Sequence, residues 1–286
     1  MPKFAGVVAA IVAAGWCTTG AAASNLIVES VRSVRLAVST DAAVITYVQN
    51  GAARTALAYG AVNARTPHPR LPQAGFRVVY GGSRGGLSCP RYRGPRLPWL
   101  VSACTARDGS HWAVQSWQRR LPNYGLRARP EQAVWEVRLS HWKGPLYSFV
   151  VKTDWTYRQF DHLYGALTYL GQPMHGFGTT RYGAPTDTYG VLVYLDTFNS
   201  AYGRGWKREN SFVTHKPSGI FCYGFFPHGI RPSGKGTHYR ATVVGPGVLP
   251  DLMWQGKAPG QYDPKRDERA NLEQERFFSD RLCRPN

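Results

Sequence analysis

Short segments in which apolar and polar residues alternate recur along this chain, and glycine or proline ends most of them. Alternation with a period of two is typical of strands that bury one face. In the segment Val134–Trp142, for example, Trp135, Val137 and Leu139 share one face and the residues between them share the other. Many short strands separated by turn residues are typical of sandwiches and barrels. We therefore predict a mainly β fold, an antiparallel sandwich or barrel-like structure with a short C-terminal helix.

The same pattern predicts strands in eight other segments. These are Leu26–Ser39, Val44–Gln49, Phe76–Tyr80, His111–Gln118, Tyr147–Trp155, Val191–Thr197, Gly219–Phe226 and Tyr239–Val244. A short helix is predicted at Tyr157–Tyr164. A longer one is predicted from Asp263 towards Leu282, because Asp263 is a suitable N-cap and Pro264 suits the first helical position.

Residues 1–23 have the three parts of a secretory signal peptide. Lys3 supplies the positive charge, Ala5–Gly15 is apolar, and three alanines precede Ser24. The apolar run is too short to cross a bilayer, which takes about 20 residues. We predict that this segment is removed and that residues 24–286 form a single β-rich domain without a transmembrane segment, secreted or held on the exterior of the cell envelope. The alternative is a sub-division of that domain near residues 84–98.

Without residues 1–23 the chain has four cysteines, and an even number in an exported protein favours disulfides. Four cysteines allow three pairings. We predict Cys89–Cys104, which closes a short loop rich in arginine and proline, and Cys222–Cys283, which attaches the C-terminal segment. A zinc site would need a C-x-x-C motif or a nearby histidine pair, and neither is present. No metal and no cofactor are predicted.

Arginine is concentrated in one part of the chain. The net charge is +18, and the window Arg54–Arg129 holds thirteen arginines, no lysine and one acid, Asp108. A guanidinium group binds phosphate, sulfate or carboxylate through two parallel hydrogen bonds. We interpret the cluster, and Arg91, Arg93 and Arg96 in particular, as a site for an anionic polymer. The alternative is a solvated scatter, because arginine is the prevailing basic residue of the whole chain.

A strongly basic chain raises the question of nucleic-acid binding. No signature of an RNP, KH, zinc-finger or helix-turn-helix module is present, and export separates the protein from the genome. We therefore predict an anionic polysaccharide or cell-wall polymer as the partner, rather than a nucleic acid.

Aromatic and polar side chains are densest between Asp196 and His215. Tyr202 and Trp206 flank a Gly-Arg204-Gly sequence that is expected to form a tight loop. Aromatic rings beside hydrogen-bonding side chains such as Asn210 are typical of sugar-binding sites. The alternative is a hairpin whose aromatic residues belong to the core.

Hydrolysis of a glycosidic bond needs two carboxylates about 5–10 Å apart. Asp196 and Glu209 are the best pair in the chain, and Asp187 is a substitute. No nucleophile elbow and no metal-binding histidine pattern are present. We therefore favour a non-catalytic binding protein over an enzyme, and keep a carbohydrate-active hydrolase using Asp196 and Glu209 as the alternative.

Three short phrases carry a resemblance. They are Tyr-Leu-Gly-Gln-Pro at 169–173, Asn-Ser-Ala-Tyr-Gly at 199–203 and Arg-Glu-Asn-Ser-Phe at 208–212. The stretch that contains them, from Trp142 to Gly256, resembles a group of uncharacterised secreted bacterial proteins. This stretch spans 115 residues. It implies export and a common fold, and it brings no activity, substrate or catalytic residue.

Overall fold

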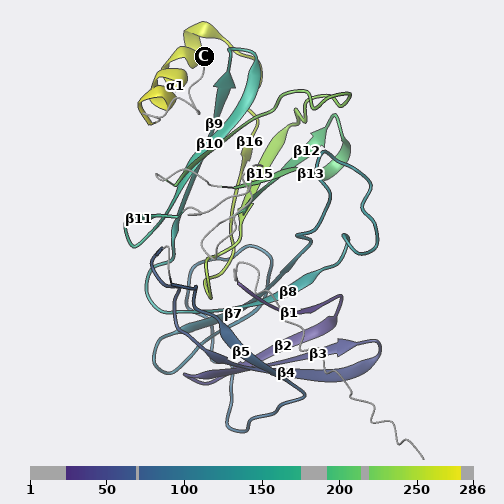
Figure 1. Cartoon of the computed structure of the whole chain (residues 1–286), viewed down its shortest axis with the longest axis vertical. Coiled ribbons are helices and arrows are strands. Elements are labelled where there is room, and N and C mark those ends of the chain that lie inside the picture. Colours follow the sequence, from purple (N-terminus) through teal and green to yellow (C-terminus); the bar gives the residue numbers. More distant parts are fainter. Residues whose placement is uncertain (1–23, 69–70, 175–191, 214–218, 278–286) are drawn as a thin grey trace, which may run out of the picture.

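The computed structural model describes residues 24–68, 71–174, 192–213 and 219–277. Within them the chain is mainly β, as predicted, with four antiparallel sheets and one C-terminal helix (Figure 1). No helix in this part of the chain combines the length and the apolar character that a bilayer crossing requires.

Two of the sheets pack face to face around a first core (Figure 1). One sheet is a meander of β2 (Arg32–Val38), β3 (Ala42–Gln49), β4 (Ala52–Gly60) and β5 (Phe76–Tyr80). The other has the order β1-β8-β7-β6 and consists of β1 (Asn25–Glu29), β6 (Leu100–Thr105), β7 (His111–Trp117) and β8 (Glu136–Trp142). Alternate residues of each strand enter the core, among them Ile45, Trp112 and Leu139, none of which is exposed at all.

The other two sheets enclose a second, larger core. In one of them β10 (Phe160–Tyr169) pairs with β9 (Ser148–Thr156), β11 (Gln172–Pro173) and β14 (Ile220–Gly224). The other has the order β13-β12-β15-β16 and consists of β12 (Leu192–Ser200), β13 (Gly203–Val213), β15 (His238–Val243) and β16 (Leu252–Lys257). Leu163, Leu195 and Tyr239 are central to this core.

Strands β7 and β8 contribute to both cores. Trp112 and Val114 of β7 face the first core, and Ala113 between them faces the second. All seven residues of β8 are buried. A strand that is covered on both faces must pair its polar side chains internally, because an unpaired polar group in the interior is costly.

The predicted helix at Tyr157–Tyr164 is wrong. Tyr157 and Arg158 have positive φ angles of 52° and 55° and form the turn between β9 and β10. From Phe160 onwards the chain is a strand, because Leu163 and Leu167 enter the second core with even spacing. The predicted strand Leu26–Ser39 is two strands, which separate at Ser30, where φ is 54°.

Helix α1 (Pro264–Phe277) begins where the sequence predicts. The Asp263 side chain accepts hydrogen bonds from the backbone N–H groups of Lys265 (2.9 Å) and Arg266 (3.3 Å), as an N-cap does. Tyr262 meets Trp155 edge to face, which holds the start of the helix against β9. The part of the predicted helix beyond Phe277 lies outside the described residues.

The disulfide Cys89–Cys104 is confirmed. Cys222 is also disulfide-bonded, but Cys283, its predicted partner, lies outside the described residues, so this pairing stays a prediction. The signal peptide at residues 1–23 lies outside them as well, and the extent of the domain stays a prediction.

Removing the Cys89–Cys104 disulfide by the double substitution Cys89→Ala and Cys104→Ala should lower the free energy of unfolding by about 3 kcal/mol, the value expected for a loop of about 15 residues. Urea unfolding followed by tryptophan fluorescence measures the change. Reduction of the wild type followed by alkylation gives a second estimate. An unchanged unfolding midpoint in the double variant would contradict the expectation.

Candidate functional site

A groove lined by tryptophans runs between the β12–β13–β15 face and the loop that follows β7. It consists of two adjoining hollows of about 190 and about 440 Å³. They share Gln118, Leu121, Trp206 and Arg208, which makes them one continuous groove. The first hollow is lined in addition by Trp99, Trp117, Trp135, Asp196 and Arg240, and the second by Pro122, Gly125, Leu126, Arg127, Ala128 and Lys207. We call this the tryptophan groove.

Strand pairing places the polar residues of the groove side by side. Asp196 of β12 lies directly across from Arg208 of β13 and from Arg240 of β15. Two positions further along β12, Phe198 lies across from Trp206. Directly opposed residues of antiparallel strands have neighbouring side chains. The sheet therefore presents an acid, two arginines and an indole ring together.

The Asp196 carboxylate holds both arginines in place. It accepts hydrogen bonds from Nε of Arg208 at 2.7 Å and from Nε and Nη2 of Arg240 at 3.0 and 2.9 Å. Only 3 % of Asp196 is exposed. The Arg240 guanidinium also lies over the rings of Trp99 and Trp206, 4.6 and 4.3 Å from the ring centroids. Cation–π contacts and a two-point ion pair together fix the orientation of this arginine.

The groove has apolar surfaces and a positive charge. Trp135 is 49 % exposed, and Trp99 and Trp206 are partly exposed. Among the lining residues Arg127, Lys207, Arg208 and Arg240 are cations and Asp196 is the one acid, which gives a formal charge of +3. Such a groove is suited to a ligand that has flat apolar faces and negative charges.

Glu209 belongs to a different cluster. Its Oε1 atom accepts a hydrogen bond from the Tyr223 hydroxyl at 3.0 Å and lies 3.3 Å from Nε2 of His228. Tyr124 covers the histidine, with ring centroids 4.1 Å apart. The Glu209 side chain is fully buried, and this burial raises its pKa to about 7. The cluster therefore holds a carboxyl group that takes up a proton near neutral pH.

The structure does not bring the predicted pair of carboxylates into one cluster. Asp196 forms ion pairs with Arg208 and Arg240, whereas Glu209 contacts Tyr223 and His228. The hydrolase alternative therefore gains no support from the geometry of this pair. Asp187, the substitute, lies outside the described residues.

The predicted sugar-binding residues lie in several places. Trp206 lines the tryptophan groove, as the sugar-platform hypothesis requires. Tyr202 is not among the lining residues of the groove, and its hydroxyl donates a hydrogen bond to the Pro232 carbonyl at 3.0 Å. Arg204 is exposed in β13 near the hairpin turn, and the Asn210 side chain accepts a hydrogen bond from the Ser211 backbone N–H at 2.8 Å.

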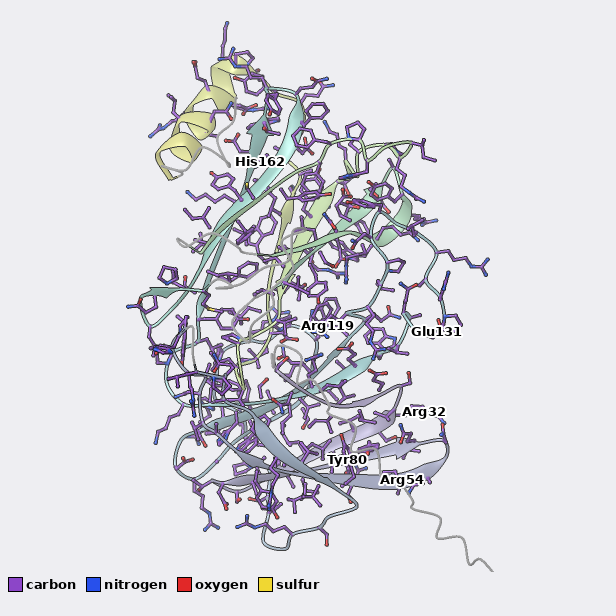
Figure 2. All side chains as sticks on the ribbon, viewed as in Figure 1. Arg32, Arg54, Tyr80, Arg119, Glu131 and His162 are labelled. Carbon is purple, nitrogen blue, oxygen red and sulfur yellow. A yellow bond between two sulfur atoms is a disulfide. The ribbon has the colours of Figure 1, made fainter. Side chains whose placement is uncertain are left out.

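The arginines of the Arg54–Arg129 window do not form one group. Arg84, Arg119 and Arg120 are paired with acids, and Arg70 lies outside the described residues. Figure 2 places Arg54 in the lower sheet, far from Arg119. Arg91, Arg93 and Arg96 are exposed on the segment before β6 and do not line the tryptophan groove. Of the window's arginines that the structure describes, only Arg127 lines the groove.

Sequence reasoning missed Trp99, Trp135 and Arg240 as groove residues. Each comes from a different element, so no local motif contains them. The described residues also contain no group of three or more His, Cys, Asp or Glu side chains that could hold a metal ion.

Comparison with protein-family models, with curated proteins and with solved structures finds no match to this chain. The resemblance to secreted bacterial proteins therefore stays an expectation. The function has to be inferred from the site itself.

The buried Glu209 carboxyl should make stability depend on pH. Its pKa is about 7 in the folded protein and 4.5 without burial, so the folded state binds the extra proton between these values. The free energy of unfolding should therefore fall by roughly 3 kcal/mol as the pH rises from about 4.5 to about 7. Glu209→Gln should remove this part of the fall and make the protein more stable than the wild type at pH 8.

Urea unfolding of both proteins between pH 4.5 and 8 measures the difference. Burial lowers the pKa of His141 and His162 to about 4, so these histidines make the free energy of unfolding rise with pH. Both proteins contain them, so their effect is the same in both. Glu131→Gln, at an exposed position, is the matched control. A Glu209→Gln profile parallel to that of the wild type would refute the role of Glu209.

Proposed function

We propose that this protein binds an acidic polysaccharide in the tryptophan groove, without catalysis and outside the cell. The observation that carries the proposal is that the exposed indole of Trp135, the partly exposed indoles of Trp99 and Trp206, and the oriented guanidinium of Arg240 line the same groove. The carboxylate or sulfate groups of such a polymer supply the negative charges, and its sugar rings supply the flat apolar faces.

The chemistry of the groove favours sugar rings that carry negative charges. A pyranose ring has a face of C–H groups that packs on an indole ring, as apolar surfaces do on aromatic side chains. Arg240 uses Nε and Nη2 for Asp196, and no described residue accepts a hydrogen bond from its Nη1. The indole rings of Trp99 and Trp206 hold the guanidinium group in place, so Nη1 is available to donate a hydrogen bond to an anionic group of the ligand.

The groove is a better candidate for the binding site than the exposed arginines of the Arg54–Arg129 window. Exposed arginines that are spread over a surface bind anions weakly, because salt and water screen each charge. In the groove the guanidinium of Arg240 is held by Asp196, Trp99 and Trp206, so little side-chain entropy is lost when a ligand binds.

Replacing Trp135 by alanine should weaken the binding of an acidic polysaccharide roughly tenfold, because the loss of one stacking surface costs about 1 kcal/mol or somewhat more. Isothermal titration with oligosaccharides of polygalacturonate or heparin measures the change. Tyr157→Ala, which removes another exposed aromatic ring outside the groove, is the matched control and should bind as the wild type does. Equal affinities of wild type and Trp135→Ala would overturn the proposal.

Single-stranded nucleic acids also stack on aromatic rings in cationic grooves. The same titration should therefore include a neutral glucan and an oligodeoxynucleotide of matched charge. We expect tight binding of the acidic oligosaccharide only. Tighter binding of the oligodeoxynucleotide would replace the proposal by nucleic-acid binding.

The charge of the groove can be tested separately. Arg127→Gln should lower the affinity several-fold at low salt and reduce the salt dependence of binding, whereas Arg54→Gln, which removes another exposed arginine in the lower sheet, should not. A third variant, in which Arg91, Arg93 and Arg96 are all glutamine, tests the arginine segment before β6. If only this third variant loses binding, the polymer binds at that segment and the groove is not the site.

A further inference from the structure

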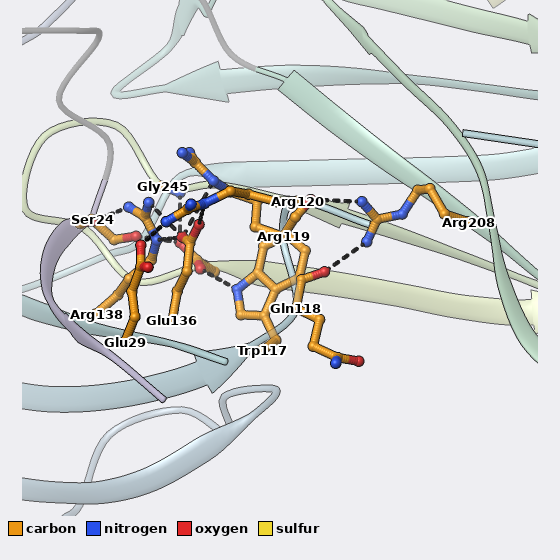
Figure 3. A network of polar contacts seen from close by, with 11 residues as sticks. Ser24, Glu29, Trp117, Gln118, Arg119, Arg120, Glu136, Arg138, Arg208 and Gly245 are labelled. Carbon is orange, nitrogen blue, oxygen red and sulfur yellow. Dashed lines mark hydrogen bonds and ion pairs between the residues drawn. The ribbon is translucent and has the colours of Figure 1, made fainter. Parts of the chain in front are cut away.

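Ser24 is anchored in the interior by all of its polar groups. Its backbone N–H donates a hydrogen bond to the Gly245 carbonyl at 3.1 Å, and its hydroxyl donates to Oδ1 of Asp251 at 2.7 Å. Its carbonyl accepts a hydrogen bond from Arg138 (Figure 3). No part of Ser24 is exposed. The first described residue is therefore held by two segments more than a hundred residues away.

Asp251 is a fully buried carboxylate. Besides the Ser24 hydroxyl it accepts hydrogen bonds from the Gly245 N–H at 3.1 Å and from the Trp117 indole at 2.7 Å. No ion pair joins it to a lysine, arginine or histidine of the described residues. A buried carboxylate without a cation is costly even when it is hydrogen-bonded.

We propose that a peptidase cleaves the chain between residues 23 and 24, and that the new α-ammonium group of Ser24 becomes the counter-ion of Asp251. This inference rests on the predicted signal peptide and not on the proposed function. In chemical terms water adds across the amide bond. Residue 23 leaves with a carboxylate, and the nitrogen of Ser24 becomes an amine that is protonated at neutral pH.

The geometry around Ser24 suits such a group. Ser24 N, Gly245 and Asp251 form a closed ring, since Ser24 N bonds to the Gly245 carbonyl and the Gly245 N–H bonds to the same Asp251 oxygen as the Ser24 hydroxyl. A peptide nitrogen has one N–H, whereas an α-ammonium has three. Cleavage therefore adds two donors and a positive charge beside the one buried carboxylate of this ring.

The ion pair would join parts of the chain that are far apart in sequence. Asp251 also exchanges two hydrogen bonds with Gln115 of β7, with distances of 2.9 and 3.0 Å. Arg138 of β8 bonds both to Ser24 and to Glu136. Cleavage would therefore strengthen the contact between the β1–β8–β7–β6 sheet and the turn before β16.

The test compares three forms of the protein, each oxidised so that the Cys89–Cys104 disulfide is present. They are the full precursor of residues 1–286, the exported product, and a product that begins with one extra glycine before Ser24. The exported product should begin at Ser24 by N-terminal sequencing. It should melt roughly 5 °C or more above the other two forms, because only it places the ammonium at Asp251. A different first residue, or equal melting temperatures of the product with and without the extra glycine, would overturn the proposal.

Asp251→Asn identifies the partner of the amine. In this background the extra glycine should change the melting temperature by less than about 1 °C, whereas in the matched Glu131→Gln background its full effect should persist. An unchanged effect in Asp251→Asn would show that the glycine acts sterically and would overturn the proposal.

If Asp251→Asn does not fold, labelling of the wild-type product with an amine reagent keeps the proposal testable. The Ser24 amine should react at least tenfold more slowly in the native than in the unfolded protein. Equal rates would overturn the proposal. Failure of this proposal leaves the groove proposal intact, because the polysaccharide titrations do not depend on the N-terminus.

Discussion

The burial of β8 on both faces is the constraint on which the rest of this structure depends. Its seven residues include Glu136 and Arg138, and neither can reach bulk water. Glu136 therefore forms ion pairs with Arg138 at 2.8 Å, Arg120 at 3.1 Å and Arg119 at 3.4 Å. A buried ion pair adds little net stability but is costly to break, so it selects one arrangement of the chain around it.

This network extends from β8 to the tryptophan groove (Figure 3). Arg119 and Arg120 directly follow Gln118, and the carbonyls of Gln118 and Arg119 accept hydrogen bonds from Arg208 at 3.2 and 2.9 Å. The loop after β7 is thus fixed at its start to Glu136 and to β13. Because this loop forms one wall of the groove, the groove is formed before any ligand arrives, which reduces the entropic cost of binding.

The sequence predicts the fold class because alternation is a local property, and Val137 and Leu139 do face the first core as their spacing indicates. It mispredicts residues 157–164 because two positive φ angles at Tyr157 and Arg158 create a turn that no glycine or proline marks. The groove could be predicted only in part. Trp206 stands out in a dense local segment, whereas Trp99, Trp135 and Arg240 come together only through strand pairing and loop packing.

The distribution of charge shows why net charge alone identifies no site. The thirteen arginines of the window have different roles. Arg119 and Arg120 form ion pairs with Glu136 inside the protein, whereas Arg127 lines the groove. Meanwhile Arg240, whose guanidinium is oriented by Asp196, Trp99 and Trp206, lies far outside the window. An arginine is suited to bind a ligand when its guanidinium plane is fixed and one of its N–H donors has no partner within the protein. Both properties come from its neighbours, Asp196 and two indole rings, and not from the number of charges nearby in the sequence.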